Sequence, residues 1–396
     1  MSNRQSTGSK INRDGSPRPR QRTIALINMQ TRSTHVIIDS QALRSNIRLI
    51  KEHLPHSTAI MAMVKANAYG HGIIECSRIA VEEGIDYLGI AFASEGVQLR
   101  KAGINAKLLL MTPPEPEEFD AIIHHDMETI VCDEQAIHSL QQQSEKVGKI
   151  INVHLFIDTG MHRDGIMPED ALMIAQKIQA SPNLHFKGLC THFATADADD
   201  TSFMKEQLEL FQSCVHSLRE ANLLPEFIHV GNSAALIRIP EEIGTLARPG
   251  LSIYGYSPIS DKMPGLQPVM QLHSSVMSVR HIKKGESVSY GRSFIADKDT
   301  GIATIPIGYG DGLFRGLSGK LQCIINGRFY PVVGNICMDE CMVDIGDDTI
   351  SIGTKVTFIG TNQDANQSAE DIALILQTIP YEITTAISAR VPRIIA

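Results

Sequence analysis

Short apolar runs alternate with amphipathic stretches from residue 34 to about residue 255, and this alternation is typical of βα units in a parallel sheet. The run THVIID (34–39) precedes a stretch in which Leu43, Ile47, Ile50 and Leu54 recur at the spacing of one helix face. Further runs of this kind are AIMAMV (59–64), YLGIAFA (87–93), KLLLMT (107–112), ETIVC (128–132), INVHLFID (151–158), HFKGLCTHF (185–193), FIHVGNS (227–233) and LARPGLSIYG (246–255). About eight such units over roughly 220 residues favour a closed (β/α)8 barrel. A doubly wound sheet is less favoured because no GxGxxG follows the first strand.

The pattern changes beyond about residue 268, where runs of strand propensity follow one another without helical stretches between them. These runs are VMQLHSSVMSVRHI (269–282), GIATIPI (301–307), LQCIINGRFYPVV (321–333), CMVDI (341–345) and KVTFIG (355–360). A helical segment, SAEDIALILQTI, and a strand-like segment, ISARVPRII, complete the chain. The sequence thus predicts an α/β protein with a TIM-like barrel over residues 34–267 and a mainly β domain over residues 268–396.

The first 33 residues are rich in Ser, Arg, Asn and Gln, and their one apolar stretch, Ile24 to Ile27, is too short for a signal peptide or a membrane span. We expect residues 1–33 to form a disordered extension. The remaining composition is that of a globular protein, with 43% hydrophobic residues and a net charge of −8. No basic stripe is present, so nucleic-acid binding is not expected.

The chain has 7 cysteines, an odd number, and none forms a CxxC pair. This argues against a disulfide framework and a zinc site, and it favours the reducing cytoplasm. Cys337 and Cys341 are four residues apart, but without a second pair this spacing is only a weak indication of a metal site.

Lys65 is the first candidate for chemistry, because it ends the apolar run 59–64 and opens AMVKANAYGHG. An ammonium at the carboxyl end of a buried strand is costly unless it is solvated, paired or made neutral, for example as a Schiff base with an aldehyde cofactor. Because barrel sites lie at the carboxyl ends of the strands, the polar residues that end the other runs belong to the same set. They are Tyr69, Asp158, Arg163, His192, Asn232, Ser233, Arg248 and Gly250. A nucleophilic lysine, a flat ring and groups that hold phosphate are the parts of a pyridoxal 5'-phosphate (PLP) site.

Together with further motifs, these residues make the chain resemble the alanine racemase family of PLP-dependent, fold-type III enzymes over roughly residues 34–396. The motifs that carry the resemblance are AMVKANAYGHG, THFATAD, GNSAA, ARPGLSIYG, SYGRSF, IGYGDG, NICMDE and YEI, in the order of the family. The resemblance implies Lys65 as the lysine that binds PLP, His192 stacked on its ring and Arg248 facing its pyridine nitrogen. It implies phosphate contacts from Tyr69, Ser233, Tyr381 and the amides of Gly250 and Leu251. It places Tyr309 at the entrance, and Arg163, Met338 and Asp339 near the substrate carboxylate.

The resemblance further implies a two-base racemisation of alanine, by Lys65 and Tyr290, that supplies D-alanine for peptidoglycan. A tyrosine hydroxyl is a poor base unless a cation stabilises its phenolate, and His192 or Arg292 is the candidate helper. The guanidinium of Arg248, with a pKa above about 12, donates hydrogen bonds without readily giving up a proton. Because Tyr290 lies outside the barrel, the resemblance implies a homodimer in which each subunit completes its partner's site.

One position departs from the family. HLFIDTGMHRDG has Phe156 where the family usually has a lysine, commonly carbamylated, whose charge orients the arginine matched by Arg163. His162 also replaces a small residue. A half-buried guanidinium still needs a counter-charge, which chloride, water or an acid such as Asp164 could supply.

Two consequences of Phe156 stay open: a racemase with weaker alanine binding, or a racemase of different or broader substrate range. PLP-dependent decarboxylases share the barrel-plus-β plan, but TGMHRDG and SYGRSF favour racemases. A non-catalytic PLP carrier usually needs only a barrel, and the β domain argues against it.

Overall fold

The structure is a computed structural model that describes residues 32–259 and 263–396. All but the last two residues of the predicted N-terminal extension lie outside this range. Among the described residues, none of the helices has the length and apolar character needed to cross a membrane.

Eight parallel strands form the predicted barrel, in the order β8-β7-β6-β5-β4-β3-β2-β9. They are β2 (Ala59–Met63), β3 (Tyr87–Ile90), β4 (Lys107–Leu110), β5 (Glu128–Val131), β6 (Ile151–Phe156), β7 (Leu184–Cys190), β8 (Phe227–His229) and β9 (Leu246–Ala247). The two ends of this sheet meet, since Thr245 N donates to Ile228 O at 2.7 Å and Arg248 N to Gly231 O at 2.8 Å. The expected (β/α)8 architecture is therefore confirmed.

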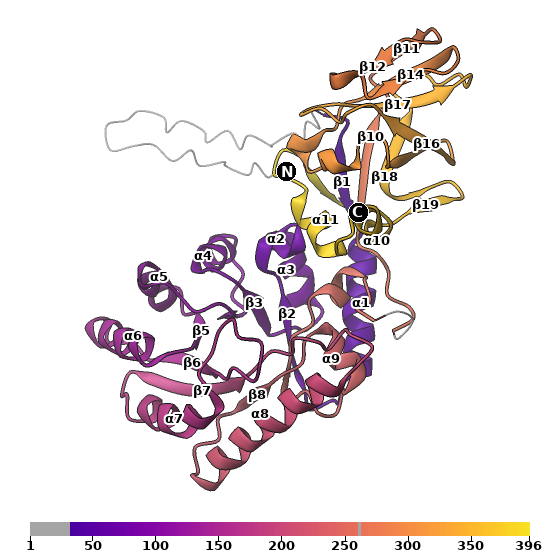
Figure 1. The fold of residues 1–396 in the computed structure, drawn as a ribbon. Coiled ribbons are helices and arrows are strands. Elements are labelled where there is room, and N and C mark those ends of the chain that lie inside the picture. Colours follow the sequence, from indigo (N-terminus) through magenta and orange to yellow (C-terminus); the bar gives the residue numbers. More distant parts are fainter. Residues whose placement is uncertain (1–31, 260–262) are drawn as a thin grey trace, which may run out of the picture. The chain divides into compact units, whose positions relative to one another are not determined.

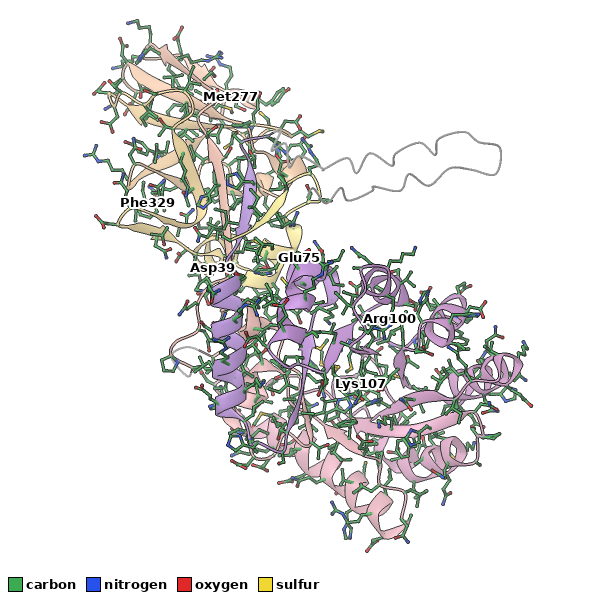
Figure 2. The ribbon with its side chains drawn as sticks, turned by 180° about the vertical axis from the view of Figure 1, so that it is seen from behind. Asp39, Glu75, Arg100, Lys107, Met277 and Phe329 are labelled. Carbon is green, nitrogen blue, oxygen red and sulfur yellow. The ribbon has the colours of Figure 1, made fainter. Side chains whose placement is uncertain are left out.

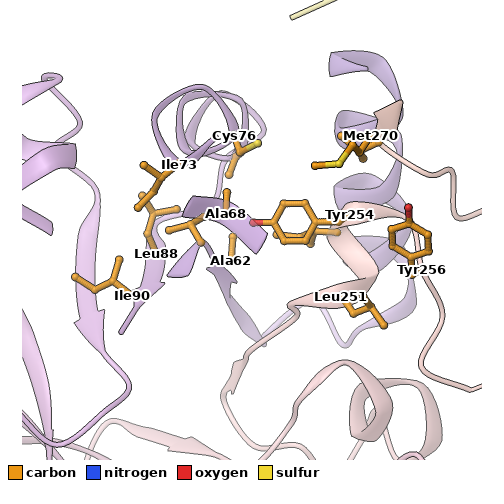
Figure 3. Packing of buried hydrophobic residues seen from close by; sticks show 14 of the residues in the cluster. Ala62, Ala68, Ile73, Cys76, Leu88, Ile90, Leu251, Tyr254, Tyr256 and Met270 are labelled. Atoms are coloured by element: carbon orange, nitrogen blue, oxygen red, sulfur yellow. The ribbon is translucent and has the colours of Figure 1, made fainter. Parts of the chain in front are cut away.

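Helices cover the outside of the barrel, one after most strands (Figure 1). They are α3 (Ile73–Glu82), α4 (Ala93–Lys101), α5 (Phe119–His124), α6 (Glu134–Val147), α7 (Ala171–Gln179), α8 (Ser202–Glu220) and α9 (Ser233–Arg238). Alternate strand residues divide the core, as a period of two requires. One set packs against the helices, with Ala62, Leu88 and Ile90 close to Ile73 and Cys76 of α3 (Figure 3). The other set fills the barrel interior: Met61, Met63, Tyr87, Leu109, Met111, Ile130, Phe156, Cys190, Phe227 and Leu246.

The first predicted strand is the one part of the barrel prediction that is wrong. Strand β1 (His35–Ile38) pairs antiparallel with β10 (Met270–Ser275) and parallel with β20 (Arg393–Ile395), so it belongs to the second sheet. The apolar run and the helix after it are real, but a local pattern does not encode which sheet a strand joins. The following helix, α1 (Ser40–His53), is capped by Asp39, which is labelled in Figure 2. The Asp39 carboxylate accepts from Gln41 N and Ala42 N.

A ten-stranded sheet makes up the mainly β part, in the order β11-β14-β17-β16-β15-β18-β10-β1-β20, with β19 paired to β18. Its other strands are β11 (Ser278–Ile282), β14 (Thr300–Ile305), β15 (Gln322–Ile325), β16 (Arg328–Val333), β17 (Cys341–Gly346), β18 (Lys355–Asn362) and β19 (Ala365–Gln367). A short hairpin, β12 (Ser287–Val288) and β13 (Phe294–Ile295), lies before Thr300 in the chain. Two helices precede the last strand: α10 (Ala369–Leu376), as predicted, and α11 (Pro380–Ala386).

The chain segment just after Lys65 contacts α11. Gly70, with φ of +86°, approaches α11 so closely that a Cβ there would lie 2.0 Å from Thr384 O. Arg393 donates from Nη2 to Gly70 O at 3.0 Å. These contacts bring Tyr381 of α11 to the mouth of the barrel.

Candidate active site

A cavity of about 500 Å³ lies at the carboxyl ends of the barrel strands. It brings together most of the residues that the sequence singled out. They are Lys65, Tyr69, Arg163, His192, Asn232, Ser233, Arg248, Gly250, Leu251 and Tyr381. The segments that supply them lie far apart in the sequence, so their convergence is a property of the fold.

Lys65 follows β2 and opens α2 (Lys65–Tyr69), which is a left-handed turn. Ala66, Asn67, Ala68 and Tyr69 have φ of 52°, 55°, 54° and 53°. Two hydrogen bonds hold the turn: Glu95 Oε1 accepts from Ala66 N at 2.7 Å, and the side chain of Asn67 accepts through Oδ1 from Ile73 N of α3 at 2.9 Å.

The pKa of Lys65 is lowered, first by burial and then by the positive charges of Arg163 and Arg248. Glu95 and Asp164 act in the opposite direction without reversing the effect. A larger fraction of this amine is therefore neutral and nucleophilic than for a solvated lysine.

Arg248 is 3% exposed and has a dense set of acceptors. Its Nη1 donates to His229 O at 2.7 Å and to His229 Nδ1 at 2.9 Å, and its Nη2 donates to Thr191 O at 2.8 Å and to His192 Nδ1 at 3.2 Å. Burial lowers the pKa of the guanidinium to about 10, which leaves it protonated near neutral pH. The described residues offer no acceptor to Nε, and the residue lines the cavity.

His192 is held neutral. Burial, followed by the charges of Arg248, Arg163 and Lys65, lowers its pKa to about 3. Because Arg248 donates to Nδ1, the ring proton lies on Nε2.

One side of the cavity is lined by small polar donors. Ser233 begins α9, and its Oγ accepts from Gly250 N at 2.9 Å and from Ser252 N at 3.4 Å. Leu251 N has no acceptor among the described residues. A Cβ at Gly250 would lie 2.5 Å from Tyr69 Oη, so only glycine lets this backbone approach the tyrosine hydroxyl. Tyr381 packs against Tyr69 with ring centroids 5.5 Å apart, and burial raises its pKa to about 12.

Phe156 ends β6 with 2% of its surface exposed, and it packs among the apolar side chains of the barrel interior. Arg163 lines the cavity and pairs with its neighbour, since Nε lies 3.0 Å from Asp164 Oδ2. The acid that the sequence offered as a substitute counter-charge therefore contacts the arginine. Asp158 accepts from the backbone N and from Nδ1 of His162, both at 3.0 Å, and fixes the turn before Arg163.

Four of the predicted residues lie in the mainly β part, outside this cavity. Tyr290 is 75% exposed, and Tyr309 and Met338 are exposed as well. Asp339 pairs with Arg390 at 2.6 Å. Tyr290 lines a second cavity of about 400 Å³. Arg292, a predicted helper of Tyr290, donates from Nε to Ser287 Oγ at 2.9 Å.

Residues that the sequence did not single out also line the main cavity, notably Asp197, Pro258 and Ile379. Asp197 stands in THFATAD, five residues beyond His192, so its place in that motif was an available signal. Glu95 had no such signal, because its role depends on the fold bringing α4 beside Ala66.

The fold and the cavity define a class of two-part enzyme, in which a (β/α)8 barrel carries the site and a mainly β part follows. The family description "Alanine racemase, N-terminal domain" matches residues 38–258, and "Alanine racemase, C-terminal domain" matches residues 269–395. The chain belongs to the alanine racemase family, whose members are isomerases.

Individual relatives agree over nearly the whole chain. The alanine racemase of Treponema denticola is 41% identical, over 92% of this chain and 98% of the relative. The alanine racemase of Clostridium novyi is 40% identical, over 90% of this chain and 94% of the relative. Among solved structures, alanine racemase from E. faecalis superposes with a TM-score of 0.88 at 32% identity, covering 93% of this chain and 99% of that one. The Bacillus anthracis enzyme with bound L-Ala-P superposes with a TM-score of 0.88 at 34% identity, over 92% and 95%.

Proposed function

We propose that this chain interconverts L-alanine and D-alanine with PLP as cofactor. The observation that carries the proposal is the single cavity in which a lysine of lowered pKa, a buried arginine and a row of small polar donors converge. Together with a second base from outside the cavity, these groups would meet the requirements of amino-acid racemisation.

The cavity fits PLP. Arg248 Nε and Leu251 N have no acceptor in the part of the chain that the structure describes, so they are donors that a ligand can satisfy, and Gly250 leaves room beside Tyr69 Oη. Ser233, Tyr69, Tyr381 and the amides of Gly250 and Leu251 would hold the phosphate, and Lys65 would bind the aldehyde carbon. His192 would lie against the ring and Arg248 would face its nitrogen. When bound, PLP supplies delocalisation of the electron pair left when the α proton of alanine is removed.

The chain's own residues would carry the proton. Lys65 and Tyr290 would act as two bases on opposite faces of the substrate, one taking the proton from Cα and the other returning one to the opposite face. Arg163 would hold the substrate carboxylate, supported by Asp164 and by the loop at Met338 and Asp339. Tyr309 would stand at the entrance.

Since Tyr290 lies outside the cavity of its own chain, we propose a homodimer in which Tyr290, Tyr309 and Met338 complete the partner's site. Their exposure in the single chain supports this arrangement. We further propose a cytoplasmic enzyme that supplies D-alanine for peptidoglycan, with domains at 34–267 and 268–396 and a separate segment 1–33.

The proposal is tested by measuring racemisation of both alanine enantiomers with and without PLP, and by reducing the loaded enzyme with borohydride. We expect activity to depend on PLP and the reduced cofactor to be on Lys65, as located by mass spectrometry. Labelling of another lysine would overturn the site assignment.

A second candidate, a racemase of broader or different substrate range, is favoured by one observation. Phe156 puts an apolar ring where the family usually has a charged lysine, and Arg163 is left with Asp164. Kinetics on alanine, serine, lysine and arginine would separate the two candidates. Exchange of the Cα proton of L-alanine in D₂O would separate either from a non-catalytic PLP carrier, which should show none.

A further inference from the structure

A row of hydrogen bonds crosses the barrel interior from the cavity to the opposite end of the barrel. Arg248 Nη1 lies 2.9 Å from His229 Nδ1, His229 Nε2 lies 2.9 Å from His154 Nδ1, and His154 Nε2 lies 3.0 Å from Glu128 Oε2. Both histidines are 0% exposed and Glu128 is 6% exposed. Glu128 is the first residue of β5, so it lies at the amino ends of the strands, away from the cavity.

The donor and acceptor roles along this row follow from the groups at its two ends, a guanidinium and a carboxylate. A guanidinium can only donate, so His229 Nδ1 must accept and its ring proton must lie on Nε2. That N–H donates to His154 Nδ1, which places the His154 proton on Nε2. His154 in turn donates to the carboxylate of Glu128, which can only accept when ionised. One arrangement therefore satisfies every member: a cation, two neutral imidazoles with the same tautomer, and an anion.

Alternative protonation states break at least one contact. A proton on His154 Nδ1 would face the N–H of His229, and a proton on His229 Nδ1 would face Arg248. Burial, followed by the charge of Arg248, holds the pKa of His229 well below its usual value. Burial alone would raise the pKa of Glu128, but hydrogen bonds from His154, Asn152 and Tyr87 outweigh it and the pKa is lowered.

The barrel is shaped to hold this row. A Cβ at Gly188 would lie 2.0 Å from His154 Nδ1, so the neighbouring strand leaves space that only glycine provides. His154 also stacks on Phe227, with ring centroids 6.4 Å apart. Glu128 accepts further bonds from Asn152 Nδ2 at 3.0 Å and from Tyr87 Oη at 3.2 Å.

We propose that Glu128 is a positioning residue for the cavity: by accepting from His154 it sets the direction of the hydrogen bonds, so that His229 presents an acceptor to Arg248. Arg248 has no carboxylate partner among the described residues, and this row is its link to one. This direction keeps Nη1 of Arg248 bound to His229 in the barrel interior. The Nε of Arg248 is then left to donate to a ligand in the cavity. The consequence for PLP rests on the proposed function, whereas the direction of the row does not.

Histidine tautomers test the row directly. In protein labelled with ¹⁵N at histidine, we expect His154 and His229 to be neutral, each with the proton on Nε2, near neutral pH and without cofactor. The signals are assigned with His154→Gln and His229→Gln. Either ring with its proton on Nδ1, or with both nitrogens protonated, would overturn the proposal.

Variants of Glu128 test its role. Glu128→Gln retains an oxygen that can accept from His154, and Glu128→Met does not. We expect Glu128→Met to disturb the ¹⁵N signals of His229, a ring that Glu128 does not touch, and Glu128→Gln to preserve them. In the PLP-loaded enzyme we expect Glu128→Met to lower kcat by roughly 10- to 100-fold with little change in the KM for alanine, as for outer-shell groups that orient a histidine, and Glu128→Gln to recover most of it.

Glu226→Gln is the matched control. Glu226 stands just before β8, is largely exposed and pairs with Lys187, and it is not a member of the row. We expect wild-type tautomers and kcat. Unchanged His229 signals in Glu128→Met, or equal losses in Glu128→Met and Glu128→Gln, would overturn the proposal. Because the tautomers are measured without PLP, they test the direction of the hydrogen bonds independently of whether the chain racemises alanine.

Discussion

Arg163 has its counter-charge on the neighbouring residue in the chain. Phe156, at the end of β6, is buried and apolar, so it offers no charge to the arginine. The guanidinium of Arg163 pairs instead with the next residue in the chain, Asp164. Arg163 is half exposed, so the pair is screened by solvent and stabilises the arginine's position only modestly.

We therefore expect Asp164→Asn to raise the KM for alanine by roughly 2- to 5-fold, the range that a loss of about 0.5–1 kcal/mol from an exposed pair gives. The change in kcat should be small, because Asp164 supports binding and does not carry a proton. Steady-state kinetics in both directions measure the effect. Glu169→Gln, an exposed acid after the same loop, should leave KM unchanged, and a KM unaltered by Asp164→Asn would show that Arg163 needs no acid.

The site was predictable from sequence where residues end strands. Lys65, His192, Ser233 and Arg248 could be collected because a parallel barrel brings all strand ends to one face. Glu128 could not be, since it stands at the start of a strand and matters only through side chains from two other strands.

Among the elements, the turn α2 stores strain next to Lys65. Four consecutive residues without glycine have positive φ, a conformation that costs roughly 1–2 kcal/mol for each such residue. The hydrogen bonds from Ala66 N to Glu95 and from Ile73 N to Asn67 offset part of this cost. Strain held in this way fixes the lysine at one place on the rim of the barrel.

Substitutions at Ala66, which is exposed, should reveal that strain. We expect Ala66→Gly to raise the free energy of unfolding by about 0.5–1 kcal/mol, because glycine adopts this conformation freely and loses part of the gain to chain entropy. Ala66→Val should lower it by about 1–2 kcal/mol, because a branched side chain fits this backbone poorly.

Urea unfolding of the two variants beside wild type measures the difference. Ala180→Gly, at the end of α7 where φ is −79°, is the control, and there glycine should not stabilise. A destabilising Ala66→Gly would mean that the turn is not strained.

The elements themselves were largely predictable, with one instructive exception. The period-two and helix-like patterns located the barrel strands, but β1 was assigned to the barrel when it completes the other sheet. Its apolar residues Val36 and Ile38 are buried in either assignment, so hydrophobicity alone does not distinguish them. Only pairing with residues far along the chain does.

For the whole molecule, the distance in sequence and fold between Lys65 and Tyr290 leads to a complementation test. Chains with Lys65→Ala and chains with Tyr290→Ala should each be inactive, and mixing them should restore activity, because a hybrid dimer has one intact site. Subunit exchange is verified with differently tagged chains. A mixture that exchanges and stays inactive would exclude sites shared between subunits.

Stability should fall in mild acid because several histidines are buried as neutral rings. Burial lowers the pKa of His71 to about 4 and that of His273 to about 3, below the usual 6.5. The unfolded chain then binds more protons, so the stabilisation is complete above pH 6.5 and is lost as pH falls. Between pH 7 and pH 5 each such histidine should cost about 2 kcal/mol of unfolding free energy.

Urea unfolding at these two pH values checks the sign and the size. His273→Gln should reduce the loss between them, whereas His281→Gln, an exposed histidine, should not. An equal loss in both variants would assign the acid sensitivity to other groups.

Strand β1 finally bears on the order in which the molecule assembles. Val36 lies opposite Arg393, and Ala396 N donates to Ile38 O at 3.0 Å, so β1 is joined to a segment that is synthesised much later. The intervening barrel can close beforehand, since its strands follow one another in sequence and domains generally fold as units during synthesis. The second sheet can be completed only after β20 has been synthesised.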